Sequence, residues 1–411
     1  GVPVPTRRSA AREGRRGPRC EGGAGGWTGG SHQSGEVTSR APCARADPPS
    51  RGSCAKRPRS LRGAGLRMTS ALNAVSGCDG FICCIGCLSL VPGLVRRVVN
   101  QVAFFPPRPP GYHVTEEKQV FLVEADYGLT PLPDLTSEGI AVDTVRMWTR
   151  RGNVILGFHF RRADSTKTLL FSHGNSTDIG IMFHHLRDLC TKLQVDVFAY
   201  EYSGYGESSG VPSEADLYSD VEAAYHYLTH DCSVPDDQIV CYGQSIGSVP
   251  SIDLASRTSV GGLVLHSAMK SGLGVIHDVK TTYWFDVFQN AARIRRVSAP
   301  VFVIHGTHDT EIPFEHGLTL YEACPREMAY DPWWVKEAGH NDIEINHRAM
   351  YFEHLARFLK ALDAHERNWR KNSENDNENE NEQGSENGWQ PLLGGAASHN
   401  PTYNYEPMNH Y

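Results

Sequence analysis

From about Asp143 onward, short apolar runs alternate with segments whose apolar residues recur at helical spacing. The first two runs, in TVRMWTRRGNVILGFHFRR, flank a Gly-Asn turn, which predicts a hairpin. The later runs are continuous and rich in β-branched and aromatic residues: KTLLFSHG, VDVFAYEYSGYG, DQIVCYGQS, GGLVLHSAM, APVFVIHGTHD and DPWWVKEAGH. Uninterrupted apolar strands are typical of a parallel sheet, in which strands are buried on both faces.

Helical segments separate these strands: DIGIMFHHLRDLCTKLQ, SEADLYSDVEAAYHYLTHD, IGSVPSIDLASRT, EHGLTLYEA and AMYFEHLARFLKALDAHE. Ser213, with Asp216 three residues later, is typical of an N-cap followed by an acidic first turn. The repetition of strand, helix and strand predicts an α/β fold with a mostly parallel, doubly wound sheet over residues 113–369.

The two ends of the chain differ in composition from this body. Residues 1–67 are rich in Arg, Gly, Ser and Pro and poor in aliphatic residues, so they predict a disordered basic leader. We expect a translated upstream leader or a gene-model extension, with the working protein beginning at Met68. The alternative is a transit peptide, although amphipathic periodicity is lacking. Residues 370–411 are acidic and of low complexity, which predicts a disordered tail.

Charge and the tail motifs say little about partners. The formal net charge of -7 averages a basic beginning and an acidic end, so it gives no case for a nucleic-acid partner. The tail contains NPTY and YEPM, which resemble endocytic sorting tetrapeptides, but matches of this length commonly arise by chance. Oligomeric state is left open by the sequence.

The chain has 11 cysteines, and four of them lie close together before the α/β region. An odd total with this clustering is unlike a secreted disulfide framework, so we expect a reducing, cytosolic compartment. The clustered residues, within a segment spanning 68–112, are Cys78, Cys83, Cys84 and Cys87.

Three interpretations of this cluster are open. The first is a zinc site, because Cys84 and Cys87 have CxxC spacing, but no second pair of ligands follows at the spacing that zinc sites show. The apolar run over 81–95 is shorter than the stretch of about 18 residues that spans a bilayer. S-acylation is the favoured interpretation, because several acyl chains followed by Arg96 and Arg97 would anchor the chain to a membrane surface. A buried or frayed apolar helix is the third interpretation.

The stretch CYGQSIGSVP places a serine between two glycines, Gly243 and Gly247, at a predicted strand-to-helix junction. This G-x-S-x-G pattern is typical of a nucleophile elbow, in which a serine lies on a strained turn. A serine hydroxyl needs a histidine to take its proton and an acid to orient that histidine. Ser245 is therefore the candidate nucleophile, although a plain turn serine would show the same five residues.

The candidate acid and base follow from chain order, which in this class of fold runs serine, acid, histidine. Asp309 ends one late strand and His340 ends the last one. Glu311 is the alternative acid. His305 lies inside a strand and His308 precedes the acid, so both break the expected order, and Asp342 is too close to His340 to be its partner.

An oxyanion hole usually combines the backbone N–H after the nucleophile with one from the loop after the third strand. Here the first donor is Ile246. The loop SHGNSTD offers Asn175 or Ser176 as the second, and only the backbone matters, so side-chain identity does not decide between them. No metal and no cofactor are expected, since this chemistry needs neither.

Taken together, the body resembles the α/β-hydrolase-domain 17 family of protein depalmitoylases. The resemblance runs from the cysteine cluster to about Leu362, through the following segments: VAFFPPRPPGY, LLFSHGNSTD, YEYSGYGESSG, YGQSIGSVPSIDLASR, LHSAMKSG, KTTYWFDVFQN, VIHGTHD and WVKEAGHNDIE. It implies an α/β-hydrolase fold, a triad of Ser245, Asp309 and His340, and acylation of the four clustered cysteines.

The resemblance also implies a function: a serine thioesterase that removes palmitate from S-palmitoylated membrane proteins. Such an enzyme would be a peripheral protein on the cytoplasmic face of the plasma membrane and endosomes. The chain departs from the family at Ala268, where proline is usual, beside the expected acyl pocket, and in its Asn-rich tail. A carboxylesterase or lysophospholipase with the same triad, or a catalytically silent scaffold, is the alternative.

Between the strand that ends near Ala268 and the strand that leads to Asp309, the intervening segment is too short for a large lid. We therefore expect a minimal lid and an open site, which suits a protein-borne acyl chain. Aromatic residues in this segment are candidate acyl contacts, and an ordinary core role is equally open. They are Tyr283, Trp284, Phe285 and Phe288.

Overall fold

The computed structural model describes residues 94–124, 128–276, 285–363 and 405–407. Several residues named above lie outside this part of the chain, among them the leader 1–67, most of the tail and the clustered cysteines Cys78, Cys83, Cys84 and Cys87. Tyr283 and Trp284 also lie outside it.

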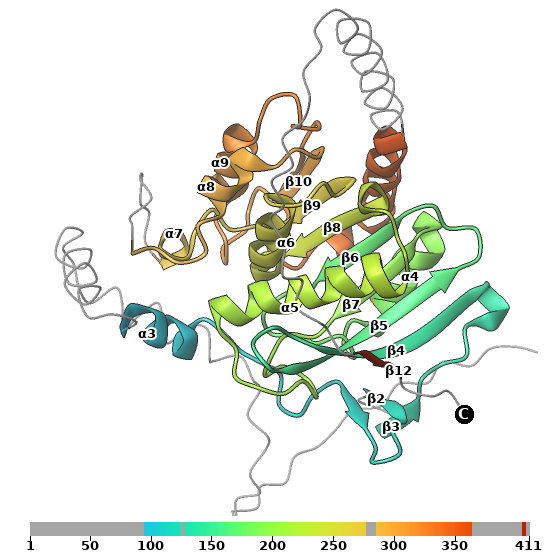
Figure 1. Ribbon diagram of the computed structural model, residues 1–411. Coiled ribbons are helices and arrows are strands. Elements are labelled where there is room, and N and C mark those ends of the chain that lie inside the picture. The colour runs from blue at the N-terminus through green and yellow to red at the C-terminus, as the bar shows by residue number, and fades with distance from the viewer. Residues whose placement is uncertain (1–93, 125–127, 277–284, 364–404, 408–411) are drawn as a thin grey trace, which may run out of the picture. The chain divides into compact units, whose positions relative to one another are not determined.

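The molecule is organised around a nine-stranded sheet in the order β11-β10-β9-β8-β6-β7-β5-β4-β12 (Figure 1). Its strands are β4 (Ile140–Trp148), β5 (Val154–Arg162), β6 (Thr168–Ser172), β7 (Asp196–Tyr200), β8 (Ile239–Gln244), β9 (Gly262–His266), β10 (Val301–Gly306), β11 (Trp333–Val335) and β12 (Tyr405–Pro407). The strands β6 to β11 pair in parallel, whereas β4, β5 and β12 pair antiparallel. This confirms the predicted hairpin and the predicted mostly parallel α/β-hydrolase sheet.

Helices cover both faces of this sheet. The helices that follow β6 along the chain are α4 (Phe183–Leu193), α5 (Glu214–His226), α6 (Ser248–Ala255), α7 (Gly272–Ile276), α8 (Asn290–Arg293), α9 (Glu315–Ala323), α10 (Ile343–Asn346) and a helix over 348–363. Single turns complete them: η1 (Thr136–Glu138), η2 (Tyr227–Asp231), η3 (Asp236–Gln238), η4 (Ser245–Gly247) and η5 (Ile294–Arg296). Ser213 caps α5 as predicted, since its hydroxyl accepts the N–H of Asp216 at 3.1 Å.

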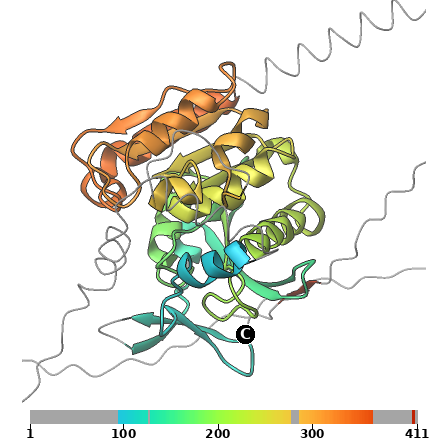
Figure 2. The ribbon, with the colours of Figure 1, turned by 90° about the vertical axis from the view of Figure 1, so that its left-hand side faces the viewer.

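The core has two halves, one on each face of the sheet. Along β8, Ile239 and Cys241 belong to the half that contains α5 and α6, while Val240 and Tyr242 belong to the half that contains α4 and the 348–363 helix. This alternation follows from the two-residue period of a strand. Figure 1 views the sheet with α5 and α6 in front, and Figure 2 shows the same layers from the side. Burial on both faces is why the strand sequences are continuously apolar.

Three features were not predicted from the sequence. A small antiparallel sheet, β1 (Tyr112–Val114), β2 (Val120–Glu124) and β3 (Gly128–Pro131), precedes the large one. The helix α3 (Leu94–Val102) leads into Phe104, whose buried ring meets Phe288 edge-on at 6.1 Å. Strand β12, part of the YEPM motif, pairs with β4, so that Glu406 lies opposite Arg146.

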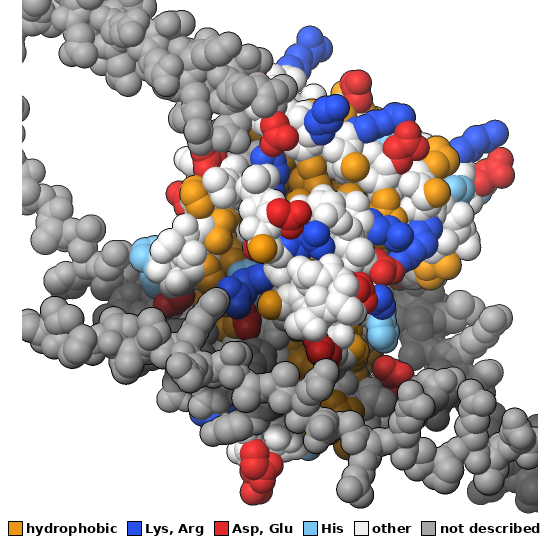
Figure 3. All heavy atoms as spheres, turned by 90° about the vertical axis from the view of Figure 1, so that its right-hand side faces the viewer, with side chains coloured by type: hydrophobic (Ala, Val, Ile, Leu, Met, Phe, Trp, Pro, Cys, Tyr) orange, Lys and Arg blue, Asp and Glu red, His pale blue; other side chains and the backbone are white. Residues whose placement is uncertain are grey.

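Basic and acidic side chains are interspersed on the face of the molecule that Figure 3 shows, with hydrophobic side chains between them. Ion pairs across the described surface include Arg150 with Glu222 at 3.0 Å and Arg187 with Glu138. Within residues 94–363, apart from the two gaps, each helix is too short or too polar to serve as a transmembrane span.

Candidate active site

Ser245 lies at the sharp turn between β8 and α6. Its φ of 53° is in the left-handed region, which is strained for a residue with a side chain. The flanking glycines make this turn possible. A Cβ on Gly247 would lie 2.1 Å from the carbonyl oxygen of Ser172, and one on Gly243 would lie 2.6 Å from the carbonyl oxygen of Gly247. The turn therefore has the geometry of a nucleophile elbow.

His340 lies in the loop that follows β11, and its side chain reaches the elbow from there. Its Nε2 lies 3.0 Å from the Ser245 Oγ, and its Nδ1 lies 2.7 Å from Oδ2 of Asp309. Since a carboxylate only accepts, Nδ1 carries the proton and Nε2 is free to accept from the serine. The structure thus brings the three predicted residues into one hydrogen-bonded chain, although 95 positions separate His340 from Ser245.

The Asp309 carboxylate is held in place from several sides. Its Oδ1 accepts the backbone N–H groups of Glu311 at 2.9 Å and Ile312 at 2.8 Å. Its Oδ2 faces His305 Nε2 at 3.4 Å as well as His340. His305 donates from the same nitrogen to the carbonyl oxygen of Ile312 at 2.9 Å, so this buried histidine faces the acid rather than the serine.

The acids and histidines that compete with Asp309 and His340 in the sequence have different surroundings in the structure. The Glu311 side chain contacts Asn341 at 3.1 Å, and His308 is exposed. Asp342 accepts the Gly339 N–H at 2.8 Å and so supports the turn that carries His340. The contact between His305 and Asp309 was not anticipated. The sequence feature that could have indicated this contact is the spacing of four residues between His305, in a strand, and Asp309, just after the end of that strand.

Asp309 and His340 shift each other's pKa in opposite directions. Burial raises the pKa of Asp309, but hydrogen bonds from His305 and His340 outweigh it and bring the pKa well below the usual range. Burial lowers the pKa of His340, but the hydrogen bond and charge of Asp309 outweigh that effect and raise it above its ordinary value. The acid is therefore ionised at neutral pH and stabilises the protonated histidine that would form when a serine gives up its proton.

The loop after β6 runs beside the elbow. A Cβ on Gly174 would lie 4.0 Å from the Ser245 Cβ, so this loop borders the nucleophile. Asn175 is half-buried and Ser176 is exposed in the same turn, while Ile246 directly follows Ser245 in η4 and is buried. The structure thus places the loop that carries both candidate second donors, Asn175 and Ser176, beside Ser245.

The segment after β9 completes the surroundings of the site. The Ser267 hydroxyl donates to the His340 carbonyl oxygen at 3.3 Å, and the next residue, Ala268, is fully buried. Phe285 is half-buried. Phe288 packs in the core against Phe104, so of the predicted acyl contacts it has the ordinary core role. Among the described residues, no group of three or more His, Cys, Asp and Glu side chains is placed to hold a metal ion.

An ordered Ser–His–Asp chain at the carboxyl ends of parallel strands can carry out nucleophilic acyl transfer. Known proteins are similar to this chain in sequence and in fold. Residues 132–262 match the family model described as Chlamydia CHLPS protein (DUF818). The fold is similar to that of an esterase of Pyrococcus furiosus, with a TM-score of 0.47, 18% identity and coverage of 56% of this chain and 95% of that one.

Two relatives are much more similar in sequence. The chain is 41% identical over 288 residues to alpha/beta hydrolase domain-containing protein aho-3 of Caenorhabditis elegans, covering 70% of this chain and 83% of that protein. It is 41% identical over 305 residues to alpha/beta hydrolase domain-containing protein 17C of Xenopus tropicalis, covering 68% and 94%. This chain is therefore a hydrolase-fold protein that belongs to the alpha/beta hydrolase domain-containing protein 17 family.

Proposed function

We propose that this chain is a serine hydrolase that removes palmitate from S-acylated cysteines of membrane-associated proteins. The observation that carries the proposal is the hydrogen-bonded chain from Ser245 through His340 to Asp309, with Nε2 of His340 3.0 Å from the serine oxygen. A binding scaffold would have no need of a strained serine, a histidine in the accepting tautomer and an ionised acid aligned in this way.

The reaction follows from this geometry in two halves. In the first, Ser245 Oγ attacks the thioester carbonyl carbon as His340 takes its proton, and the protonated histidine then gives that proton to the departing cysteine sulfur. The product is a palmitoyl ester on Ser245. In the second half, His340 takes a proton from water, the hydroxide attacks this ester, and palmitate leaves as Ser245 regains its proton.

The thioester substrate rests on the resemblance to protein depalmitoylases. The nucleophilic step is the same for an oxygen ester, so the two substrate classes must be separated by measurement.

The test compares two substrates of matched sequence, a peptide palmitoylated on cysteine and one palmitoylated on serine. The proposal expects hydrolysis of the thioester at a clearly higher kcat/KM, with labelling of Ser245 by a fluorophosphonate probe. Preference for the oxygen ester would instead favour a carboxylesterase or lysophospholipase. Absence of both labelling and turnover in folded protein would favour the silent scaffold.

Membrane attachment forms a second part of the proposal. We infer that acyl chains on Cys78, Cys83, Cys84 and Cys87 hold the enzyme on the cytoplasmic face of the plasma membrane and endosomes, where its substrates lie. Replacing all four by serine should move the protein to the soluble fraction while leaving hydrolysis of a soluble thioester unchanged. Continued membrane retention, with hydroxylamine also failing to release the parent protein, would contradict this attachment.

A further inference from the structure

The loop that carries Gly174 and Asn175 is held between two parts of the molecule. On one side is the elbow, where residue 247 must be glycine because a Cβ there would lie 2.1 Å from the Ser172 carbonyl oxygen. On the other side is the segment that follows β7, in which the Tyr202 hydroxyl donates to the His173 carbonyl oxygen at 2.6 Å. A Cβ on Gly247 would also lie 2.8 Å from the His173 carbonyl oxygen, so this oxygen lies between the elbow and Tyr202.

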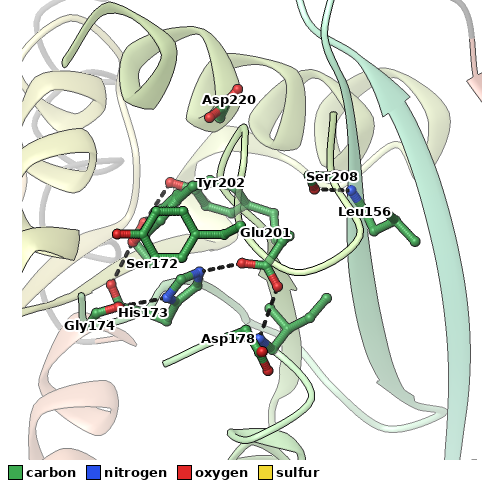
Figure 4. Close-up of polar contacts among 12 residues, drawn as sticks. Leu156, Ser172, His173, Gly174, Asp178, Glu201, Tyr202, Ser208 and Asp220 are labelled. Atoms are coloured by element: carbon green, nitrogen blue, oxygen red, sulfur yellow. Dashed lines mark hydrogen bonds and ion pairs between the residues drawn. The ribbon is translucent and has the colours of Figure 1, made fainter. Parts of the chain in front are cut away.

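The His173 side chain is fully buried. Figure 4 shows its ring between the Gly174 carbonyl oxygen and the Glu201 carboxylate. Nδ1 lies 2.8 Å from the Gly174 oxygen and Nε2 lies 2.9 Å from Glu201 Oε1. The ring also stacks on Tyr202, with centroids 4.0 Å apart. These contacts fix the ring in position and orientation.

The direction of the hydrogen bonds follows from the chemistry of the partners. A backbone carbonyl oxygen can only accept, so Nδ1 of His173 must carry a proton and donate it to Gly174. At Nε2 the partner is a carboxyl group, which holds the ring whether the proton lies on the nitrogen or on the oxygen. The other carboxyl oxygen of Glu201 accepts the Ile179 N–H at 3.2 Å, so the acid is itself held.

The bond to the Gly174 carbonyl determines where the next N–H points. In a planar trans peptide, the C=O of one residue and the N–H of the next point in opposite directions. The hydrogen bond from His173 thus fixes the plane of the Gly174–Asn175 peptide, in a loop where a Cβ on Gly174 would lie 4.0 Å from the Ser245 Cβ. We propose that His173 and Glu201 are positioning residues that orient this peptide, and that the Asn175 N–H is thereby the second oxyanion donor. The inference rests on the proposed function, because an oxyanion forms only when Ser245 attacks an acyl group.

The side chain of Asn175 supports this assignment because both its oxygen and its nitrogen are engaged elsewhere. Its Oδ1 accepts the Tyr205 hydroxyl at 2.6 Å and the Phe105 N–H at 2.9 Å, and its Nδ2 donates to the Ala103 carbonyl oxygen at 2.7 Å. The side chain thus fastens the loop to the segment that follows α3. The contribution of Asn175 to the reaction is left to its backbone N–H.

Two substitutions of His173 separate the two ring nitrogens. An asparagine places its amide near the Nδ1 position and can still donate to Gly174, whereas a glutamine reaches the Nε2 position and keeps the contact with Glu201. We expect His173→Gln to lower kcat about a hundredfold, the cost of losing one oxyanion donor, with KM changed by less than about twofold. His173→Asn should keep at least about ten times more kcat than His173→Gln.

A role limited to pairing Glu201 predicts the reverse order, with the glutamine variant the more active, and that result would overturn the proposal. Equal losses in the two variants, or a glutamine variant with the kcat of the wild type, would do the same. Thermal unfolding of each variant shows whether lost activity reflects lost structure, since oxyanion stabilisation affects kcat and leaves the unfolding temperature alone.

Should neither variant fold, the wild-type protein still gives an answer. Nitrogen-15 NMR of protein labelled in histidine reports which ring nitrogens carry protons, and the proposal requires a protonated Nδ1 in His173. An unprotonated Nδ1 would overturn it. Kinetics are run with both an oxygen ester and a palmitoyl thioester. If the thioester alone is not cleaved, the proposed substrate is wrong while the order of the His173 variants is still tested.

Discussion

His340 Nδ1 lies 2.7 Å from Oδ2 of Asp309, and this contact raises the pKa of the histidine against the opposing effect of burial. His340 must be neutral to accept the Ser245 proton, so activity is lost as the pH falls through its pKa. We predict that kcat/KM for a soluble ester falls on the acid side with a midpoint above 6.5, the ordinary histidine value. A midpoint below 6.5 would show that burial, rather than Asp309, dominates the titration of His340.

The identity of the acid is tested by a matched pair of amides. Asp309→Asn should lower kcat by about ten-thousandfold, because the amide favours the wrong histidine tautomer and cannot stabilise the protonated ring. Glu311→Gln should change kcat by less than about threefold, since the Glu311 side chain contacts Asn341 and only its backbone N–H contacts Asp309. A severe Glu311→Gln with a mild Asp309→Asn would reverse the assignment.

The elbow is tested by adding one carbon atom. In Gly247→Ala the new Cβ would lie 2.1 Å from the Ser172 carbonyl oxygen, which is backbone and cannot move aside without moving β6. We expect a loss of about 3 kcal/mol or more in the free energy of unfolding. The control is Gly174→Ala on the facing loop, where the new carbon would meet atoms no closer than 3.9 Å and stability should be close to that of the wild type. Equal denaturation midpoints for the two variants would contradict this account.

Asp220 provides a prediction about stability and pH. Burial raises its pKa to about 8, despite hydrogen bonds from the backbone and hydroxyl of Ser203. The folded state thus holds a proton that the unfolded chain, with a pKa near 3.8, has already released. This contribution to stability is fully present below the unfolded value and is lost as the pH rises through the folded one.

An asparagine at this position should remove that dependence, because its amide can donate as the protonated acid does. Unfolding temperatures of wild type and Asp220→Asn, measured from about pH 4 to about pH 9, should show the variant gaining on the wild type as the pH rises. A difference that stays constant over this range would mean that Asp220 does not titrate in it.

Much of this architecture could be predicted because the relevant signals are local. Continuous apolar runs give the parallel strands, and Ser213 gives the start of α5. The order of Ser245, Asp309 and His340 along the chain was sufficient to select them, since parallel strands bring their carboxyl ends to one edge. The role of Gly243 and Gly247 could also be predicted, because they flank the serine in the G-x-S-x-G pattern.

The remaining features depend on contacts between distant segments. The engagement of Asn175 by Phe105 joins residues 70 positions apart, and that of His173 by Glu201 joins residues 28 apart. No periodic pattern in the sequence indicates that the two residues of either pair are in contact. The strands β1, β3 and β12 are at most four residues long, so they lack the apolar runs that identified the larger strands. Strand β2 has the apolar run VFLV, but it precedes the region in which strand and helix segments alternate.

Ser245→Ala, assayed on a palmitoyl-thioester peptide, tests the central claim most directly. One hydroxyl at a half-buried position contributes little to stability, so the variant should keep the unfolding temperature of the wild type within a few degrees. We predict that it loses fluorophosphonate labelling altogether and that its turnover falls to the rate without enzyme or close to it. Undiminished labelling or thioester turnover, in a variant that unfolds at the wild-type temperature, would contradict the assignment of Ser245 as the nucleophile.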